Sequence, residues 1–186
     1  AMKTELIQHI ELLIGSIGVI LGLYFAALLL APRQKQPKAN LFLAIYLFAF
    51  SLRVGKSLFH NYFDIDANLR TLFLTTLLCV GPSIWLYTLY FIKPNTKQIT
   101  KDWIHFIPFF LLASCCWLIP NDGSSWIFGV FYNFLIAHML LYILFSLYQF
   151  QQSIGSKNLK ENPKATQWLY HILGKNLLFI ILYFLI

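Results

Sequence analysis

The sequence contains few charged residues. Asp, Glu, Lys and Arg make up 11% of its 186 residues, and hydrophobic residues make up 59%. A soluble domain carries about 25% charged residues. The mean hydropathy of this chain is +0.66. The shortage of charge therefore argues against a soluble domain and predicts a polytopic membrane protein.

Cysteine is also scarce. Cys79 lies inside one apolar run, and the neighbours Cys115 and Cys116 lie inside another. Cysteines in such positions commonly act as small apolar side chains. Three of them form neither a disulfide framework nor a four-ligand zinc site. We expect the chain to hold no metal and no cofactor.

The sequence has no recognisable catalytic constellation either. It lacks a nucleophile elbow, and its intramembrane serines have no compelling histidine partner. It also has no histidine-rich set for a di-iron or zinc centre. We therefore expect no catalytic residues, and the chain is predicted not to be an enzyme.

Long apolar runs are what the sequence does contain. About 20 apolar residues suffice for a helix to cross a hydrocarbon core of roughly 30 Å. Hydrocarbon offers no partner for an open backbone group, and the intervening loops are too short and irregular for a barrel. We predict an all-α transmembrane bundle that forms a single domain over residues 1–186. Its six spans are expected at about residues 6–31, 39–60, 68–92, 103–119, 125–149 and 168–186.

The gaps between these runs alternate in the sign of their charge. Because cytoplasmic loops collect Lys and Arg, the odd gaps are predicted to face the cytoplasm and the N-terminus to lie outside. Six crossings then leave the C-terminus outside, and the basic loops are expected to contact anionic membrane lipids. The basic residues of the odd gaps are Arg33, Lys35 and Lys38 in gap one, Lys93, Lys97 and Lys101 in gap three, and Lys157, Lys160 and Lys164 in gap five; the acidic residues of the even gaps are Asp64 and Asp66 in gap two and Asp122 in gap four.

Ionisable residues inside the spans indicate a candidate binding site, because charge is costly in a bilayer. Glu11 lies about 9 Å into the first span. It shares a face with three glycines that permit close helix approach, so we expect it to face the bundle. Arg53 lies about 10 Å below the outer surface, on a stripe of the second span with Lys56 and His60. Arg70 begins the third span nearby.

Two interpretations of this cluster remain open. In the structural one, Glu11 neutralises Arg53, Lys56 extends to the outer interface, and nothing binds. In the functional one, an excess of positive charge in an outward-facing cavity binds a carboxylate, a phosphate or a lipid head group. The arginine would supply a bidentate fork and the lysine a mobile charge.

Three further features of the spans are candidates for function. Gly81 and Pro82 lie near the centre of the third span, where a proline bends a helix, so they are a candidate hinge; improved packing is the alternative. Asn133 and His138 lie inside the fifth span and are candidate ligand-binding residues. His138 shares a helical face with Tyr142 and can alternatively be a hydrogen-bonded structural residue.

Three segments carry a resemblance to a known family. They are the apolar run Asn40–His60, the segment Gly81–Tyr87 and the segment His105–Phe109. Together they resemble the N-terminal membrane region of AraC-type bacterial transcriptional regulators. The resemblance implies a multi-pass sensor in the bacterial cytoplasmic membrane, followed by a helix-turn-helix DNA-binding domain. It also implies a seventh helix beyond residue 186, a possible homodimer, and contact with DNA only through that missing domain.

The sequence leaves other functions open. A small solute transporter could use a charged cavity and a Gly-Pro break. A similar membrane module could precede a histidine kinase, and a structural or assembly subunit could use its charges only to hold helices together. The expected ligand of a sensor is an anionic small molecule or a lipid, which the sequence does not identify further.

Overall fold

The computed structural model describes residues 2–32, 36–63, 65–94, 99–119, 125–154, 159–160 and 163–185. Every regular element in these ranges is helical, so the all-α prediction is confirmed for this part of the chain. The elements in chain order are α1 (Met2–Leu29), α2 (Pro37–Tyr62), α3 (Ala67–Thr75), α4 (Leu77–Ile92), α5 (Ile99–Asp102), the 3₁₀ turn η1 (Trp103–Phe106), α6 (Ile107–Ser114), the 3₁₀ turn η2 (Cys116–Leu118), α7 (Trp126–Ser153) and α9 (Pro163–Leu185).

Four helical segments of the described chain are long and apolar enough to cross a membrane. They are His9–Leu29, Pro37–Leu58, Ala67–Ile92 and Trp126–Ser153. The third of them is interrupted at Thr76, where α3 ends and α4 begins. Four of the six predicted spans are therefore long and apolar enough to cross a membrane as described.

The predicted span at 103–119 is not one continuous helix. Its apolar helical part, Trp103–Ser114, is about 18 Å long at 1.5 Å per residue, short of the roughly 30 Å of a hydrocarbon core. Pro108 lies in the first turn of α6 and cannot donate a backbone hydrogen bond to a preceding turn. The chain accordingly enters α6 through the 3₁₀ turn η1, and we call the whole segment 99–118 the interrupted rod.

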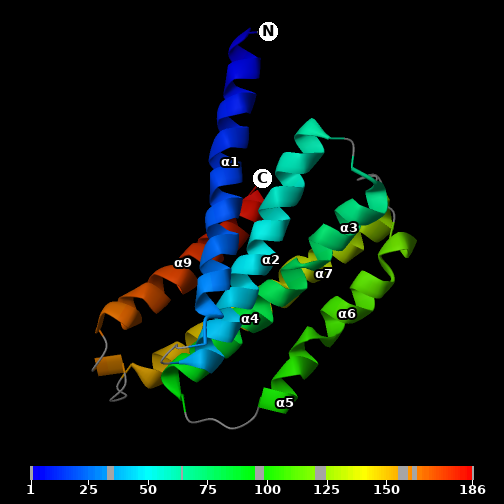
Figure 1. Cartoon of the computed structure of the whole chain (residues 1–186). Coiled ribbons are helices and arrows are strands. Elements are labelled where there is room, and N and C mark those ends of the chain that lie inside the picture. The colour runs from blue at the N-terminus through cyan, green and yellow to red at the C-terminus, as the bar shows by residue number, and fades with distance from the viewer. Residues whose placement is uncertain are drawn as a thin grey trace.

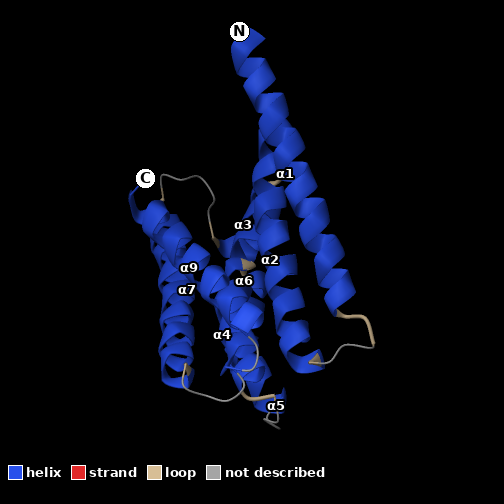
Figure 2. Cartoon of the chain, turned by 90° about the vertical axis from the view of Figure 1, so that its left-hand side faces the viewer, coloured by secondary structure: helices blue, strands red, loops and turns tan. Residues whose placement is uncertain are grey.

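Successive segments run in alternating directions along the bundle (Figure 1). The C-terminal ends of α1, α4 and α7 lie at the same end as the beginnings of α2, α5 and α9, and the two termini lie toward the opposite end (Figures 1 and 2). The predicted basic gaps therefore gather on one side. We call this side the basic-loop end; its described lysines are Lys38, Lys93, Lys101, Lys160 and Lys164.

Helix α4 forms the centre of the bundle. It packs between α2 and α7, and 78% of the most apolar window of Ala67–Ile92 is buried, compared with 6% for His9–Leu29 in α1. Helix α1 lies at the periphery and packs against α2. The residues that α4 and its two neighbours turn toward each other are thus well shielded from the surroundings of the bundle.

Two glycines of α1 set its register against α2. A Cβ atom at Gly15 would lie 2.6 Å from Leu58 Cδ2, and one at Gly22 would overlap the Ser51 hydroxyl. The two helices are antiparallel, so residue numbers that face each other sum to about the same value. This register fixes which residues of α1 lie level with the charged residues of α2.

Candidate anion-binding site

Three cations from two helices meet away from the basic-loop end. Arg53 and Lys56 lie near the end of α2, Arg70 lies in α3, and all three side chains are half-buried. Lys56 is within electrostatic range of both arginines. Helix α7 adds the hydroxyl of Tyr132, which is hydrogen-bonded to Arg53. We call Arg53, Lys56 and Arg70 the cationic cluster; the structure brings together three of the predicted site residues in it.

The two arginines retain unused hydrogen-bonding capacity. A guanidinium group carries five N–H donors. One Nη atom of Arg53 donates to Ser57 Oγ at 2.8 Å, but its Nε is buried without a partner, and so is Nε of Arg70. A buried donor left unsatisfied costs about 1–3 kcal/mol. Because both Nε atoms are buried, a ligand could reach the two guanidinium groups only through their Nη atoms.

No described carboxylate pairs with the cationic cluster. Asp66 accepts a hydrogen bond of 2.9 Å from the backbone N–H of Asn68 and caps α3. Asp64 lies outside the described residues. Like charges in partly buried surroundings repel one another, and Lys56 lies within electrostatic range of both arginines. The cluster is therefore an electrostatically costly arrangement that an anion would relieve.

The expectation that Glu11 faces the bundle is wrong, because its side chain is exposed. Gly22 faces Ser51 and Gly15 faces Leu58, so Ile20 is level with Arg53. Glu11 lies nine residues further along α1, which is about 13 Å at 1.5 Å per residue. The first turns of α1 continue to the level of the last turn of α2 and beyond (Figure 1). The predicted depths assumed that the two spans end at the same level, whereas α1 extends beyond the end of α2 (Figure 1).

Two other predicted site residues are exposed. His60 is exposed in the last turn of α2. Asn133 is exposed on α7, and its Nδ2 donates to the backbone oxygen of Gly129 at 2.9 Å. The local hydrogen bond occupies Asn133 within its own helix. His60 lies four residues, about one helical turn, beyond Lys56.

His138 belongs to a separate group. Its ring lies 4.9 Å from that of Tyr142, as the shared helical face predicts, and Tyr142 Oη lies 2.8 Å from His105 Nδ1. Trp85 packs edge-on against the His105 ring at 4.8 Å. His138 Nδ1 is buried without a hydrogen-bond partner. His138 lies six residues from Tyr132, about 9 Å along α7, so these two polar groups are distinct.

The candidate hinge Gly81–Pro82 lies where α4 and α7 pack most closely. A Cβ atom at Gly81 would lie 3.1 Å from Tyr142 Cβ and 3.2 Å from Met139 Cα. The break in this span occurs instead at Thr76, one and a half turns before Pro82. The contact gives Gly81 a packing role, and a hinge at these residues stays a prediction.

The basic-loop end holds a different polar arrangement. Tyr90 donates a hydrogen bond to Oδ2 of the buried Asp102, and Lys38 Nζ lies 5.3 Å from the centre of the Tyr90 ring. The Phe42 ring stacks on Tyr90 at 5.6 Å and on Phe106 at 6.3 Å. This aromatic layer attaches the interrupted rod to α2 and α4. The only acid of the third gap is thus satisfied internally.

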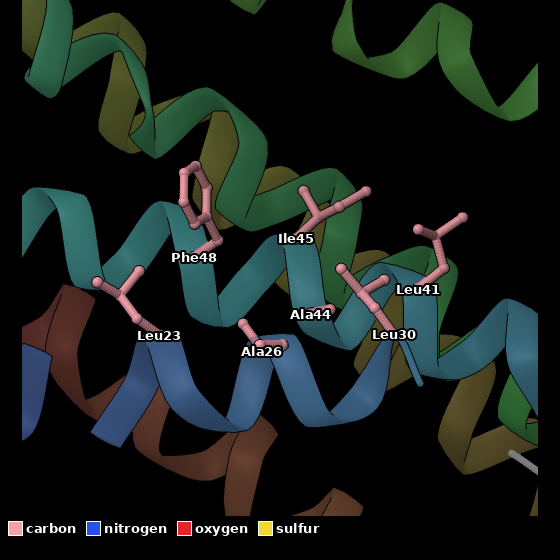
Figure 3. A pocket seen from close by; sticks show the side chains of 8 residues that line it. Leu23, Ala26, Leu30, Leu41, Ala44, Ile45 and Phe48 are labelled. Carbon is pink, nitrogen blue, oxygen red and sulfur yellow. The ribbon is translucent and has the colours of Figure 1, made fainter. Parts of the chain in front are cut away.

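A separate hollow of about 440 Å³ lies between α1 and α2 (Figure 3). It could receive a hydrocarbon chain, but it offers no polar group to select a head group. We therefore do not place the candidate site there. Its lining is entirely apolar and consists of Leu23, Ala26, Ala27, Leu30, Leu41, Ala44, Ile45 and Phe48.

Several residues of these polar groups were not among the predicted site residues, including Tyr132, His105 and Asp102. Tyr132 escaped notice because a tyrosine in an aromatic-rich span has no distinguishing pattern. His105 was noticed only as part of an apolar segment. Asp102 offered the clearest signal, since it is an acid within a basic gap.

Within the described residues, no group of three or more His, Cys, Asp or Glu side chains could hold a metal ion. The chain matches no protein-family model, no curated protein and no solved structure. The resemblance to AraC-type regulators therefore stays a prediction.

Proposed function

We propose that this chain is the membrane-embedded ligand-sensing module of a bacterial regulator, and that its ligand is an anion held by the cationic cluster. The main support is the presence of three half-buried cations without a paired carboxylate among the described residues. Such a group is suited to binding, whereas a cluster with its own counter-ion would be suited to holding helices together.

The proposed orientation places the cluster in the outer half of the bacterial cytoplasmic membrane. The described lysines of the odd gaps gather at the basic-loop end, as cytoplasmic loops do. The N-terminus would then lie outside, and all six segments would cross the membrane. The interrupted rod would cross it as a series of short helices. In this orientation, Arg53 and Arg70 are accessible to a ligand from the outer side.

The proposed output is transcription control through a cytoplasmic DNA-binding domain, as the resemblance to AraC-type regulators implies. A seventh helix would return the chain to the cytoplasm, and dimeric modules would bring two DNA-binding domains together. The coding sequence downstream of residue 186 tests this part. A seventh apolar segment followed by a helix-turn-helix domain supports it, whereas a kinase domain would indicate the histidine kinase alternative.

Ligand binding is tested by thermal unfolding of the purified protein in detergent. We expect a panel of anionic metabolites and anionic lipids to contain a compound that raises the unfolding temperature. A ligand at 100 times its Kd stabilises a protein by about 2.7 kcal/mol. The shift should disappear in Arg53→Ala and persist in the matched control Lys164→Ala, which removes an exposed cation at the basic-loop end.

Two results would contradict the proposal. The first is that no anion shifts the unfolding temperature of the native protein. The second is an equal shift in Arg53→Ala, which would place any binding elsewhere. Uptake of a solute into proteoliposomes, abolished by Arg53→Ala, would instead support the transporter.

A further inference from the structure

We propose that the anion bound by the cationic cluster is a phosphate with at most one ester bond, either free in solution or at the head of a lipid such as phosphatidic acid. This inference rests on the proposed function, since it names the ligand class of the same site. It distinguishes phosphate from carboxylate, which the sequence left as equal alternatives. The distinction follows from the number, type and origin of the donors.

The charge of the site matches a dianion better than a monoanion. Arg53, Lys56 and Arg70 provide three positive charges without a paired acid in the described structure. A phosphate monoester carries a charge of about −1.5 to −2 at pH 7, whereas a carboxylate carries a single negative charge. A carboxylate would leave most of the mutual repulsion in place.

The donors also approach from three helices. Arg53 and Lys56 come from α2, Arg70 comes from α3, and the Tyr132 hydroxyl at Arg53 comes from α7. A planar carboxylate has two oxygens and is well served by one guanidinium fork. A tetrahedral phosphate has further oxygens that point in other directions, so it can engage two forks from different helices at once. Because the Nε atom of each arginine is buried, the Nη atoms are the donors available for this purpose.

The surroundings are compatible with both sources of phosphate. Tyr132 stacks on Phe128 at 6.0 Å, and both rings are half-buried on α7. An apolar wall beside the cations suits the glycerol and acyl portion of a phospholipid. A soluble phosphate or phosphate ester would use the cations alone.

The experiment measures binding to the whole chain in a neutral detergent by thermal unfolding and by calorimetric titration. The soluble probes are sodium phosphate, sodium acetate, which carries a single charge, and sodium succinate, whose two planar carboxylates match the charge of phosphate but not its shape, all at matched ionic strength. The lipid probes are phosphatidic acid and phosphatidylcholine, added as detergent-solubilised lipid. We expect a saturable effect from phosphate, from phosphatidic acid or from both, and a markedly weaker effect from acetate, succinate and phosphatidylcholine.

Substitutions of Arg70 distinguish the contribution of its positive charge from that of its forked donor geometry. Arg70→Lys keeps the charge but removes the fork, and we expect it to weaken phosphate binding by about 10-fold. Arg70→Gln removes both and should weaken binding by more. Lys164→Gln, at the basic-loop end, is the matched control for nonspecific attraction of anions, and we expect a change of less than about 2-fold. Circular dichroism of each variant verifies that its helices are retained.

The outcomes distinguish this inference from the proposed function. Binding of phosphatidic acid without free phosphate supports the inference and identifies a lipid source, and the reverse result identifies a soluble one. Equal or tighter binding of acetate or succinate overturns the inference but leaves an anion sensor intact. If no anionic probe binds, both proposals fail. Equal weakening by Lys164→Gln and Arg70→Gln would likewise remove the cluster as the site.

Discussion

The two ends of the bundle hold their positive charges in different ways. At the basic-loop end, Lys38 lies over the ring of Tyr90, and Tyr90 donates to the buried carboxylate of Asp102. Toward the opposite end, Arg53 and Arg70 each retain a buried Nε without a partner. The first arrangement contains its own acid, whereas no described acid pairs with the second.

The proposed binding role of the cationic cluster rests on this difference. A charge that has its partners within the fold contributes to stability, and its removal is costly because a buried partner is left behind. A set of like charges without a partner destabilises the empty fold and gains when an anion arrives. We therefore expect substitutions at the two ends to have opposite signatures in stability and in ligand response.

The largest loss of stability is expected at the contact between α4 and α7, because α4 carries a residue of the basic-loop end and α7 carries a residue next to the cationic cluster. Helix α4 carries Tyr90 and α7 carries Tyr132, and the two helices pack closely at Gly81. Gly81→Val would push against Met139 Cα and Tyr142 Cβ and should destabilise the protein by about 3 kcal/mol. Denaturant unfolding in detergent measures this change.

The matched control for that substitution is Gly129→Val on the exposed face of α7, where a Cβ atom would meet nothing within 4 Å. It should leave stability within about 0.5 kcal/mol of native. Equal stability of the two variants would show that Gly81 is not a packing position. The hinge interpretation would then regain support.

Removing the carboxylate of Asp102 at the basic-loop end should cause the next largest loss of stability. Asp102→Ala leaves the buried Tyr90 hydroxyl without its acceptor, and hydrogen bonds to charged groups are worth about 1.5–3 kcal/mol. Unfolding of Tyr90→Phe and of the double variant completes a cycle, in which the double variant should cost less than the sum. Strict additivity would contradict the proposed partnership. Ligand binding at the cationic cluster should be unchanged in Asp102→Ala.

The sequence predicted the all-α class because the apolar runs have both the length and the composition of bilayer-crossing helices. It also predicted that the basic gaps would lie together, since alternate crossing is a consequence of chain continuity. It could not predict the broken segment at 103–119, where composition is as apolar as elsewhere. The effect of Pro108 on the start of α6 depends on local backbone geometry, which hydropathy does not record.

The candidate site was predicted in part. Arg53 and Lys56 were placed together because their spacing is a helical property, and Arg70 because it follows in the next segment. Glu11 was misplaced because the level of one helix against another depends on packing, here on Gly15 against Leu58 and Gly22 against Ser51. Tyr132 could not be predicted for the same reason. The sequence shows which residues share a face of one helix, but it does not show which residues of different helices lie at the same level.

A smaller effect is expected at the cationic cluster in the absence of ligand. Arg53→Gln removes hydrogen bonds to Ser57 and Tyr132 but also removes repulsion with Lys56. These contributions oppose each other, so the free energy of unfolding should change by less than about 1 kcal/mol. Addition of a bound anion should then stabilise the native protein and not the variant. A loss of about 3 kcal/mol without ligand would instead assign Arg53 a structural role like that of Asp102.

The smallest effect is expected for Glu11, and it tests whether the cluster truly lacks its own acid. Because Glu11 is exposed and about 13 Å along the bundle axis from Arg53, Glu11→Gln should change stability by less than about 0.5 kcal/mol. Anion affinity should stay within 2-fold of native, since screening attenuates exposed charges beyond about 8 Å at physiological salt. Titration calorimetry on both proteins measures that affinity. A clear gain in affinity on removing Glu11 would mean that its carboxylate competes with the ligand, and the two ends would then differ only in how tightly an internal acid is held.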